Sequence, residues 1–532
     1  MAVSTSLLGI VILIYLLVVF YCGWLAYQRT KDVDDYMLAG RQVHPYILAL
    51  SYGATFISTS AIIGFGGVSA TLGMGLLWLV FMNIFVGIFI AFAIFGSRTR
   101  RIGARLGAIT FPELLGKRFK SRFIQGFSGA LIGLFMPLYA GIVLIGGARF
   151  IETALGINYD IAVLILIIIV AAYVITGGML AVMYTDALQG SLMIGGMGIL
   201  LVLTYMKLGG ITEAHQALTD MAPLVPASLA AGGHMGWTAM PKFGSPIWWT
   251  MVSTIILGVG IGVLAQPQLA VRFMTVDSNR SINRAIFVGG PFILLMAGVA
   301  YIVGALSNVY FLNERGMIAL EAAGGNIDMI MPEYINSAMP EVFVIIFMVT
   351  LLAAAMSTLS SQFHTMGTAI GHDLYREFLM KGKTGRTIPV IKVGIAVTIL
   401  ISVILAYVLP ISIIARATAI FFGLCAAAFL PMYAGALFWK RMTREGAIAS
   451  MLTGTFTSLF WLAFVHTKEA APLGICNAIY GTETLLSGTW TMVDPILVAT
   501  PIAALVAIGV SLITEPPAND HIEKCFGKSS TG

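Results

Sequence analysis

The chain has 532 residues, of which 58% are hydrophobic and only 10% are charged, with a formal net charge of +6. Soluble domains carry about 25% charged residues, so this composition excludes an ordinary soluble protein. Apolar runs of about 20 residues recur along the whole chain, and each can cross a bilayer core about 30 Å thick. A barrel is excluded because its strands alternate apolar and polar residues, whereas these runs are apolar all round. We therefore expect an all-α polytopic membrane protein with membrane lipid around it and no nucleic acid partner.

The apolar pattern predicts about 13 transmembrane helices. Their expected ranges are 6–28, 46–70, 75–97, 123–155, 160–177, 184–206, 246–272, 284–309, 340–371, 388–409, 412–438, 446–466 and 490–514. The first range lacks the basic start and small-residue cleavage site of a signal peptide, so we expect a retained helix. Between the helices, the segments 207–245, 310–339 and 467–489 have the composition of short surface or re-entrant helices.

The basic residues divide unequally between the two sides of the predicted bundle. Segments that follow odd-numbered helices hold 24 of the 30 Lys and Arg residues, Arg272 among them. Because positive charge stays on the cytoplasmic side, this division predicts an N-terminus outside and a C-terminus in the cytoplasm. The expected location is the plasma (inner) membrane, with a flexible tail after residue 514. The four cysteines suggest no structural disulfide.

Two predicted helices contain residues that interrupt a helix. The range 46–70 holds a run of small and hydroxylated residues followed by Gly64, Gly66 and Gly67. The range 246–272 holds a glycine run, 258–262, followed by Gln266-Pro267. Glycine weakens a helix and proline removes a backbone donor, so both helices should be kinked or unwound near their centres. These are the second and seventh helices, five apart. Broken helices at matching places in two five-helix halves indicate an inverted-repeat transporter with its site at the midplane.

A third stretch offers oxygen atoms without charge. Ala354, Ser357, Thr358 and Ser361 recur at helical spacing and share one face of the ninth predicted helix. Such a face serves either close helix packing or the binding of a hard cation. We expect the hydroxyls of Ser357 and Thr358 to meet the carbonyls of Ala54 and Ile57 at the first break, which with the Ala354 carbonyl would give a five-oxygen site for a monovalent cation.

The sequence resembles the sodium:solute symporter family in four places. They are Leu50-Ser51-Tyr52-Gly53-Ala54, then Gly177 to Val182 with Thr185-Asp186 and Gln189, then Ala354 to Ser360, and finally Gly435 to Arg441 followed by Gly446-Ala447. The resemblance implies a leucine-transporter-type fold with two inverted five-helix repeats. The expected parts are an extra helix and loop (1–42), the first repeat (43–210), an extracellular segment (211–245), the second repeat (246–440), two further helices (441–514) and a cytoplasmic tail (515–532).

The resemblance also implies positions for ions. The family's common sodium site corresponds to Ala54, Ile57, Ala354, Ser357 and Thr358, and the coupling ion is Na⁺. A second sodium site, present in some members, corresponds to Asp186, Ser360 and Ser361 together with Ser357. Asp186 could instead cap a helix start, where the helix dipole stabilises a carboxylate.

The solute should bind beside the breaks. The candidate residues are Thr55, Phe56, Ser58, Thr59, Tyr139, Val259, Val263 and Gln266. The proline-transporting members have Asp, Trp and Tyr where this chain has Phe56, Val259 and Val263. The lining is therefore more aliphatic, and it lacks the dense polar lining of the sugar carriers. We expect a short monocarboxylate such as lactate, pyruvate or propionate, held by hydroxyls and by N–H groups at a half-helix start. Amino acids and pantothenate remain alternatives.

Other readings of the chain stay open at this stage. A proton-coupled carrier could use Asp186 or His364, although a single histidine in a bundle is more often a packing residue. Arg149 and Arg416 could attract an anionic solute or close an outer gate, or they could extend to the interface. A membrane sensor or a channel is a further alternative. We find no nucleophile, nucleotide loop or metal-ligand cluster, so we do not expect an enzyme, and we expect a functional monomer.

Overall fold

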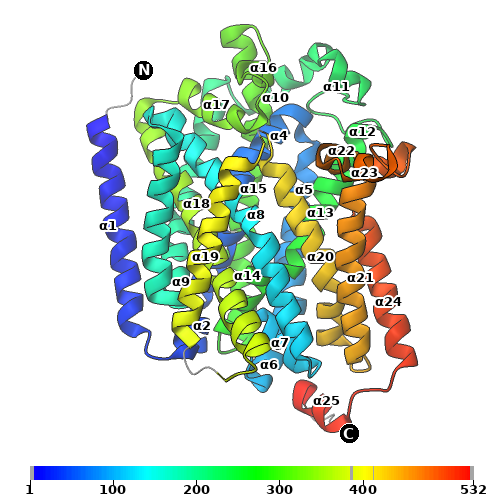
Figure 1. Cartoon of the computed structure of the whole chain (residues 1–532). Helices are drawn as coiled ribbons and strands as arrows, with labels where there is room; N and C mark the ends of the chain where they lie inside the picture. Colours follow the sequence, from blue (N-terminus) through cyan, green and yellow to red (C-terminus); the bar gives the residue numbers. More distant parts are fainter. Residues whose placement is uncertain (1–4, 384–386, 411, 528–532) are drawn as a thin grey trace.

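The computed structural model describes residues 5–383, 387–410 and 412–527, and within these ranges the regular structure is entirely helical. The chain starts at one end of an upright helix bundle and finishes at the other (Figure 1). The long helices are α1 Thr5–Arg29, α8 Arg122–Leu155, α9 Tyr159–Lys207, α15 Asn279–Arg315, α18 Glu341–Thr368, α19 Thr387–Val408, α20 Ile414–Phe438, α21 Arg444–Phe464 and α24 Ile496–Ile513. A π-helical segment, Ala369–Leu379, continues α18.

Three further segments cross the bundle in pieces. The first is α3 Pro45–Phe56, followed by the π-turn Ser60–Gly64 and α4 Phe65–Leu72. The second is the turn Met74–Leu76, α5 Leu77–Ile84, the π-helix Phe85–Gly96 and α6 Ser97–Leu106. The third is α12 Pro246–Trp249, the π-helix Thr250–Leu257, α13 Gly258–Gly262, the turn Val263–Ala265, α14 Pro267–Ala270 and the turn Val271–Thr275.

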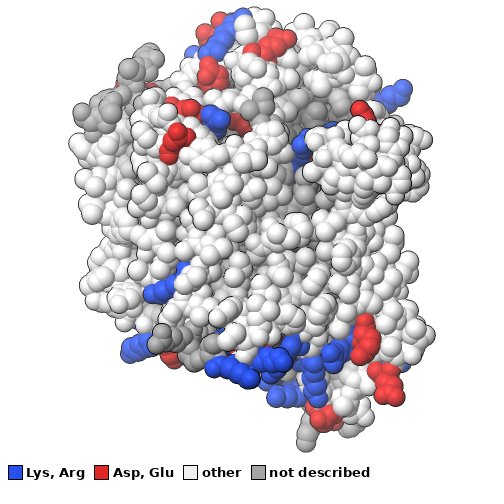
Figure 2. All heavy atoms as spheres, viewed as in Figure 1, with Lys and Arg blue, Asp and Glu red and all other residues white. Residues whose placement is uncertain are grey.

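Short helices cover both ends of the bundle. Lys and Arg gather at the end that holds α6, α7 Phe111–Arg118 and α25 Asn519–Phe526, hereafter the basic end (Figures 1 and 2). The helix α2 Val33–Leu38 and the turn Ala39–Arg41 lie there too. The opposite end carries α10 Ile211–Asp220, α11 Ala227–Ala231, α16 Ala319–Ala322, α17 Ile330–Ala338, α22 Thr467–Leu473 and α23 Ile475–Tyr480, with 3-10 turns at Ala222–Leu224, Ile327–Met329 and Gly488–Met492. The sequence predicted such surface helices in these three segments, and that prediction is confirmed.

The helices account for the predicted number of spans. Eleven helices of the described ranges are long and apolar enough to cross a membrane, and the bent pair Pro45–Phe56 and Ser60–Leu72 makes twelve. The helix α9 has 49 residues. At 1.5 Å per residue it is about 70 Å long, more than twice the thickness of a bilayer core. Its backbone leaves the helical region at Gly178, with φ 58° and ψ −151°, so it comprises two helices and the total approaches the predicted 13.

Both predicted interruptions are confirmed. The first lies between α3 and the turn that leads to α4, where the axis bends by 52°. The second lies at Gln266, whose ψ of 116° is extended, directly before Pro267. This position is one turn beyond the glycine run, because the proline rather than the glycines ends the helix.

The end of the chain differs from the prediction. We expected a flexible tail after residue 514, but residues 519–526 form α25 against the basic end. His521 and Cys525 of this helix are buried, and the His521 ring contacts the Arg118 carbonyl at 2.9 Å. The helix has only eight residues, so its apolar side is too short for the sequence pattern to distinguish it from an unstructured polar tail.

Glycine allows the first broken helix to touch α15. A Cβ atom added to Gly304 would lie 2.1 Å from the carbonyl oxygen of Gly66 in α4, so the two backbones meet directly. On the same helix, a Cβ atom added to Gly298 would meet nothing within 4 Å. Only the first of these glycines is required by packing.

We expect Gly304→Ala to lower the melting temperature of the detergent-solubilised protein by several degrees, because overpacking a close contact costs about 1–3 kcal/mol. Gly298→Ala, in the same helix, should leave it unchanged or raise it slightly, since alanine is the better helix former. Thermal unfolding of both variants measures this. Equal melting temperatures would contradict the close α4–α15 contact.

Candidate sodium and solute site

The first break frees backbone oxygens in the centre of the bundle. The peptide N–H of Ile57 still donates to the Gly53 carbonyl at 2.8 Å, but the chain is extended at Ile57 and no helix continues from it. The carbonyls of Ala54 and Thr55 therefore lack the usual partners one turn later. Hydroxyls of α18 take that role.

The oxygens of the predicted sodium site converge here. The Ser357 hydroxyl donates to the Ala54 carbonyl at 3.0 Å and to the Ala354 carbonyl at 3.3 Å. The Thr358 hydroxyl donates to the carbonyls of Ala54 at 3.4 Å and Thr55 at 3.2 Å. Five neutral oxygen atoms thus lie together and are fully buried. Oxygens of this kind suit a hard monovalent cation.

Four of the five residues predicted for this cation site therefore meet. Ile57 lies at the break itself, and among the described residues its carbonyl makes no hydrogen bond to this group. The Thr55 carbonyl joins the group instead, although the sequence assigned Thr55 to the solute. Both residues flank the same break, so the spacing fixed the place but not the orientation of each peptide.

A buried ion pair lies next to these oxygens. The Arg272 guanidinium contacts the Asp186 carboxylate at 2.7 Å, and both side chains are completely buried. The same carboxylate accepts hydrogen bonds from Ser51 at 2.9 Å and Ser360 at 3.2 Å. Ser361 and Thr55 complete the cluster through contacts to both charged groups, so every charge has several partners.

The position of Arg272 corrects the sequence analysis. We counted it among basic loop residues, but it lies inside the bundle at the end of the second broken helix. Arginine holds a planar set of donors that can serve a carboxylate and two hydroxyls at once. Without it, a buried Asp186 would carry an uncompensated charge, which is costly in a membrane interior.

The residues predicted for a second sodium ion do come together, but around a guanidinium. Ser360 and Ser361 each donate a hydrogen bond to the Asp186 carboxylate, at 3.2 and 3.3 Å. Arg272 contacts two of these three residues in this conformation. The proposed alternative role of Asp186, that of a helix cap, does not apply because it lies in the interior of α9.

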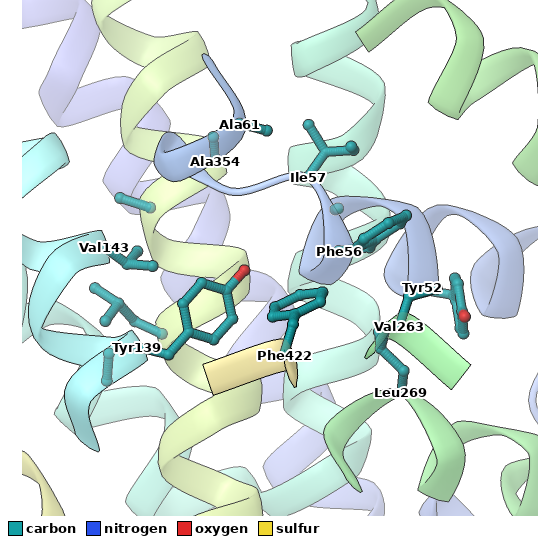
Figure 3. Packing of buried hydrophobic residues seen from close by; sticks show 14 of the residues in the cluster. Tyr52, Phe56, Ile57, Ala61, Tyr139, Val143, Val263, Leu269, Ala354 and Phe422 are labelled. Carbon is teal, nitrogen blue, oxygen red and sulfur yellow. The ribbon is translucent and has the colours of Figure 1, made fainter. Parts of the chain in front are cut away.

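A small cavity lies on the other side of the first break. Its volume is about 10 Å³, so the surrounding side chains nearly fill it. Figure 3 shows the rings of Tyr139 and Phe56 on either side of Phe422, with the Tyr139 hydroxyl pointing toward the break. The lining residues are Phe56, Ile57, Ser58, Ser60, Ala61, Phe65, Asn83, Tyr139, Val259, Tyr301, Thr418 and Phe422. None of them carries a charge.

Two polar groups of this cavity have no hydrogen-bond partner among the described residues. They are the Ser60 hydroxyl and the Asn83 side-chain oxygen, in residues that are 1% and 2% exposed. Buried polar groups are nearly always bonded, so an exception indicates a place where a ligand or water binds. Ser58 and Tyr139 bond to each other across the same space at 3.3 Å.

Half of the residues predicted for the solute line this cavity: Phe56, Ser58, Tyr139 and Val259. The other four lie elsewhere. Thr55 belongs to the ion-pair cluster. The Thr59 hydroxyl donates to the Val143 carbonyl at 3.0 Å, Val263 packs near Gly87, and the Gln266 amide donates to the Gly262 carbonyl at 3.2 Å.

The sequence analysis missed several lining residues. Ser60 and Thr418 are ordinary hydroxyls with no distinguishing pattern, and Phe422 stands in a run of apolar residues. Asn83 did leave a signal, because it is the only amide or charged side chain between residues 75 and 96. Such a residue in a membrane helix is a candidate for function by default.

Three residues weighed from the sequence lie away from the centre of the site. The His364 ring contacts the Tyr36 carbonyl at 3.1 Å and lies against the Tyr36 ring, as a packing residue does. Arg149 pairs with Glu152 at 2.8 Å and covers the Tyr159 ring. Arg416 lies nearer the opposite end of the bundle, beside Glu469 at 3.4 Å.

The chain belongs to the sodium:solute symporter family, whose model matches residues 36–454. It is 29% identical over 465 residues to the sodium/proline symporter of Salmonella typhimurium, with 87% of this chain and 88% of the relative covered. It is 27% identical over 473 residues to the osmoregulated proline transporter of Bacillus subtilis, with 88% and 90% covered.

The fold has a counterpart among solved structures. A Na⁺-coupled sialic acid symporter superposes with a TM-score of 0.73 at 18% identity, covering 96% of this chain and 98% of the other. This likeness confirms the leucine-transporter-type fold. Membership of the family identifies the chain as a multi-pass membrane transporter that couples a solute to Na⁺, and not as an enzyme.

We expect Arg272→Gln to destabilise the solubilised protein strongly, because loss of one partner leaves Asp186 as an unpaired buried charge at a cost of about 3–5 kcal/mol. The double variant Asp186→Asn with Arg272→Gln should recover much of that loss. Thermal unfolding of the singles and the double measures the coupling.

The matched control is Arg315→Gln. Arg315 pairs with Glu333 at 2.9 Å, but both side chains are about one-third exposed. Such pairs contribute about 0–1 kcal/mol, so this change should have little effect. Equal effects of Arg272→Gln and Arg315→Gln would contradict the buried pair.

Proposed function

We propose that this transporter carries a short monocarboxylate, of the lactate, pyruvate or propionate type, together with Na⁺. One observation supports it best. The small cavity beside the first break, hereafter the midplane cavity, has no charged side chain in its lining, yet it holds apolar rings and the Ser60 hydroxyl, which has no hydrogen-bond partner among the described residues. The half-helix of residues 60–72 begins there, and its dipole favours an anion at this end. In this conformation the N–H groups of Ser60, Ala61 and Ile62 bond to Ser58. No carboxylate of the lining could pair with an amine.

The proposed sodium site is the group of oxygens around Ala54, Thr55, Ala354, Ser357 and Thr358. It lies on α18 and on the last turn of α3, so a bound ion connects the two elements. The solute cavity lies at the other side of the same break. Sodium binding thereby fixes the backbone that the solute must meet, which couples the two ligands. The two repeats, 43–210 and 246–440, move against each other around this centre.

We propose that the basic end faces the cytoplasm, in accordance with the positive-inside rule. We also propose that Arg272, rather than a second sodium ion, neutralises Asp186 in the conformation described. A second ion at Asp186, Ser360 and Ser361 requires the guanidinium to withdraw.

An amino acid such as proline is the second candidate. It is supported by the relatives, several of which are proline transporters at 27–29% identity. Backbone carbonyls freed at the two breaks could receive the amine of a zwitterion, as they receive hydroxyls here. Proline and the monocarboxylates share the carboxylate and a small apolar body, and they differ in the amine.

Uptake into proteoliposomes separates the candidates. We expect labelled lactate, pyruvate or propionate to accumulate only with an inward sodium gradient, and the uncharged lactamide not to compete. Accumulation of proline alone would replace the first candidate by the second. Uptake that follows a proton gradient and ignores sodium would contradict the proposed coupling site.

The sodium site has its own test. Thr358→Ala removes one oxygen, so the sodium concentration for half-maximal uptake should rise about tenfold, since an interaction with a charged group is worth about 1.5–3 kcal/mol. Thr398→Ala is the matched control, because the Thr398 hydroxyl is equally buried but bonds only within its own helix, to the Ile395 carbonyl. An unchanged sodium requirement in Thr358→Ala would remove that residue from the site.

A further inference from the structure

A second and much larger cavity opens at the opposite end of the bundle. Its volume is about 380 Å³, within the range of small-molecule sites. It lies among α4, the π-helix 250–257, the start of α20, and the surface helices α11 and α22. Figure 2 shows the molecule hollowed beside the lobe formed by α22 and α23, with Lys or Arg atoms at the wall of the hollow. We call this space the vestibule.

The vestibule is aligned with the midplane cavity. Two helices, α4 and α20, line both spaces, and so does the continuous segment made of the π-helix 250–257 and α13. On each, the two lining positions are about one helical turn apart. The pairs are Phe65 and Val68, Val259 and Ile255, and Thr418 and Ala415, where the first of each pair faces the midplane. One turn of helix is about 5.4 Å. A solute in the vestibule is therefore one step from the proposed site.

The wall of the vestibule combines an apolar surface with positive charge. Leu72, Leu229, Ile247 and Ile255 supply aliphatic side chains, and Arg416 and Lys468 supply cations. No carboxylate lines the space within the described ranges. Arg416 is partly neutralised by Glu469 at 3.4 Å, but Lys468 has no ion pair among the described residues. Its ammonium group donates only to the Thr250 hydroxyl at 2.9 Å.

We propose that the vestibule is a capture site for a small carboxylate with an apolar body, in which Lys468 and Arg416 bind the carboxylate and the aliphatic wall holds the body. The proposal rests on the proposed function for the class of solute. The vestibule concentrates the anion one helical turn from the midplane cavity, before the rings of Phe56, Tyr139 and Phe422 move apart. A cation at a cleft mouth raises the local concentration of anions and their rate of entry.

A thiol reporter tests binding in the vestibule without transport. Ile247 is a half-buried wall residue, whereas native Cys425, Cys476 and Cys525 are buried and Cys22 lies apart in α1. Labelling of Ile247→Cys by a methanethiosulfonate reagent is followed in proteoliposomes without sodium, with butyrate or its uncharged isostere butyramide present. The parent chain gives the background rate.

We expect butyrate at twice its dissociation constant to slow the labelling about threefold, by simple occupancy, and butyramide to leave it unchanged. When Lys468→Gln is combined with Ile247→Cys, the slowing should fall to about 1.4-fold, because up to about fivefold weaker binding leaves the vestibule mostly empty at this butyrate concentration. Lys242→Gln should not reduce it, because Lys242 is an exposed lysine of the same end that does not line the vestibule. Arg416→Gln is a second variant that should weaken protection.

Equal protection by butyrate and butyramide would overturn the role of the charges, and protection by neither would overturn the site. Protection that survives both Lys468→Gln and Arg416→Gln would also overturn it.

In uptake, Lys468→Gln should raise KM for the carboxylate up to about fivefold with kcat unchanged, as expected for one partly exposed charge pair. If the protein takes up carboxylates but butyrate does not slow labelling of Ile247→Cys, the vestibule site is disproved and the proposed function stands. If butyrate slows the labelling but the protein takes up no carboxylate, the proposed function is disproved and the vestibule site stands.

Discussion

The structure depends on one constraint: a backbone polar group inside a membrane must find a partner within the protein. At the first break, the carbonyls of Ala54 and Thr55 have no N–H group ahead of them. They are satisfied by the hydroxyls of Ser357 and Thr358, which α18 brings from 300 residues away in the chain. Because the break is tolerated only where such partners exist, it lies in the centre of the bundle. The same oxygens form the proposed sodium site.

The ion pair of Asp186 and Arg272 extends this arrangement to the second broken helix. Arg272 follows Gln266-Pro267, and its guanidinium reaches across to α9 and α3. Thr55 links the ion pair to the oxygens at the first break. Its carbonyl accepts a hydrogen bond from the Thr358 hydroxyl, and its own hydroxyl accepts one from Arg272. A change at the cation site therefore acts on a residue that also contacts the ion pair. Four elements of the transporter meet at this point: α3, α9, α18 and the turn after α14.

The two cavities indicate how the bundle is divided along its length. The midplane cavity holds about 10 Å³ and is closed by the rings of Phe56, Tyr139 and Phe422, whereas the vestibule holds about 380 Å³. In this conformation a solute has room at the opposite end but not at the centre. The helices that carry both linings include π-helical segments and half-helices, whose backbone bonds are less uniform than those of a regular helix.

The sequence by itself determined the membrane class, the approximate number of helices, the two breaks and the family. These follow from local properties: run length, the position of glycine and proline, and short motifs. It also brought together Ala354, Ser357 and Thr358, because helical spacing alone places them on one face. The tertiary structure decided the rest. It buried Arg272 beside Asp186, moved Thr55 from the solute to the ion pair, and brought Ser60, Asn83 and Thr418 to one cavity. It also docked α25 on the basic end. These outcomes depend on which side chains of distant helices face each other, and no pattern within a single helix encodes that.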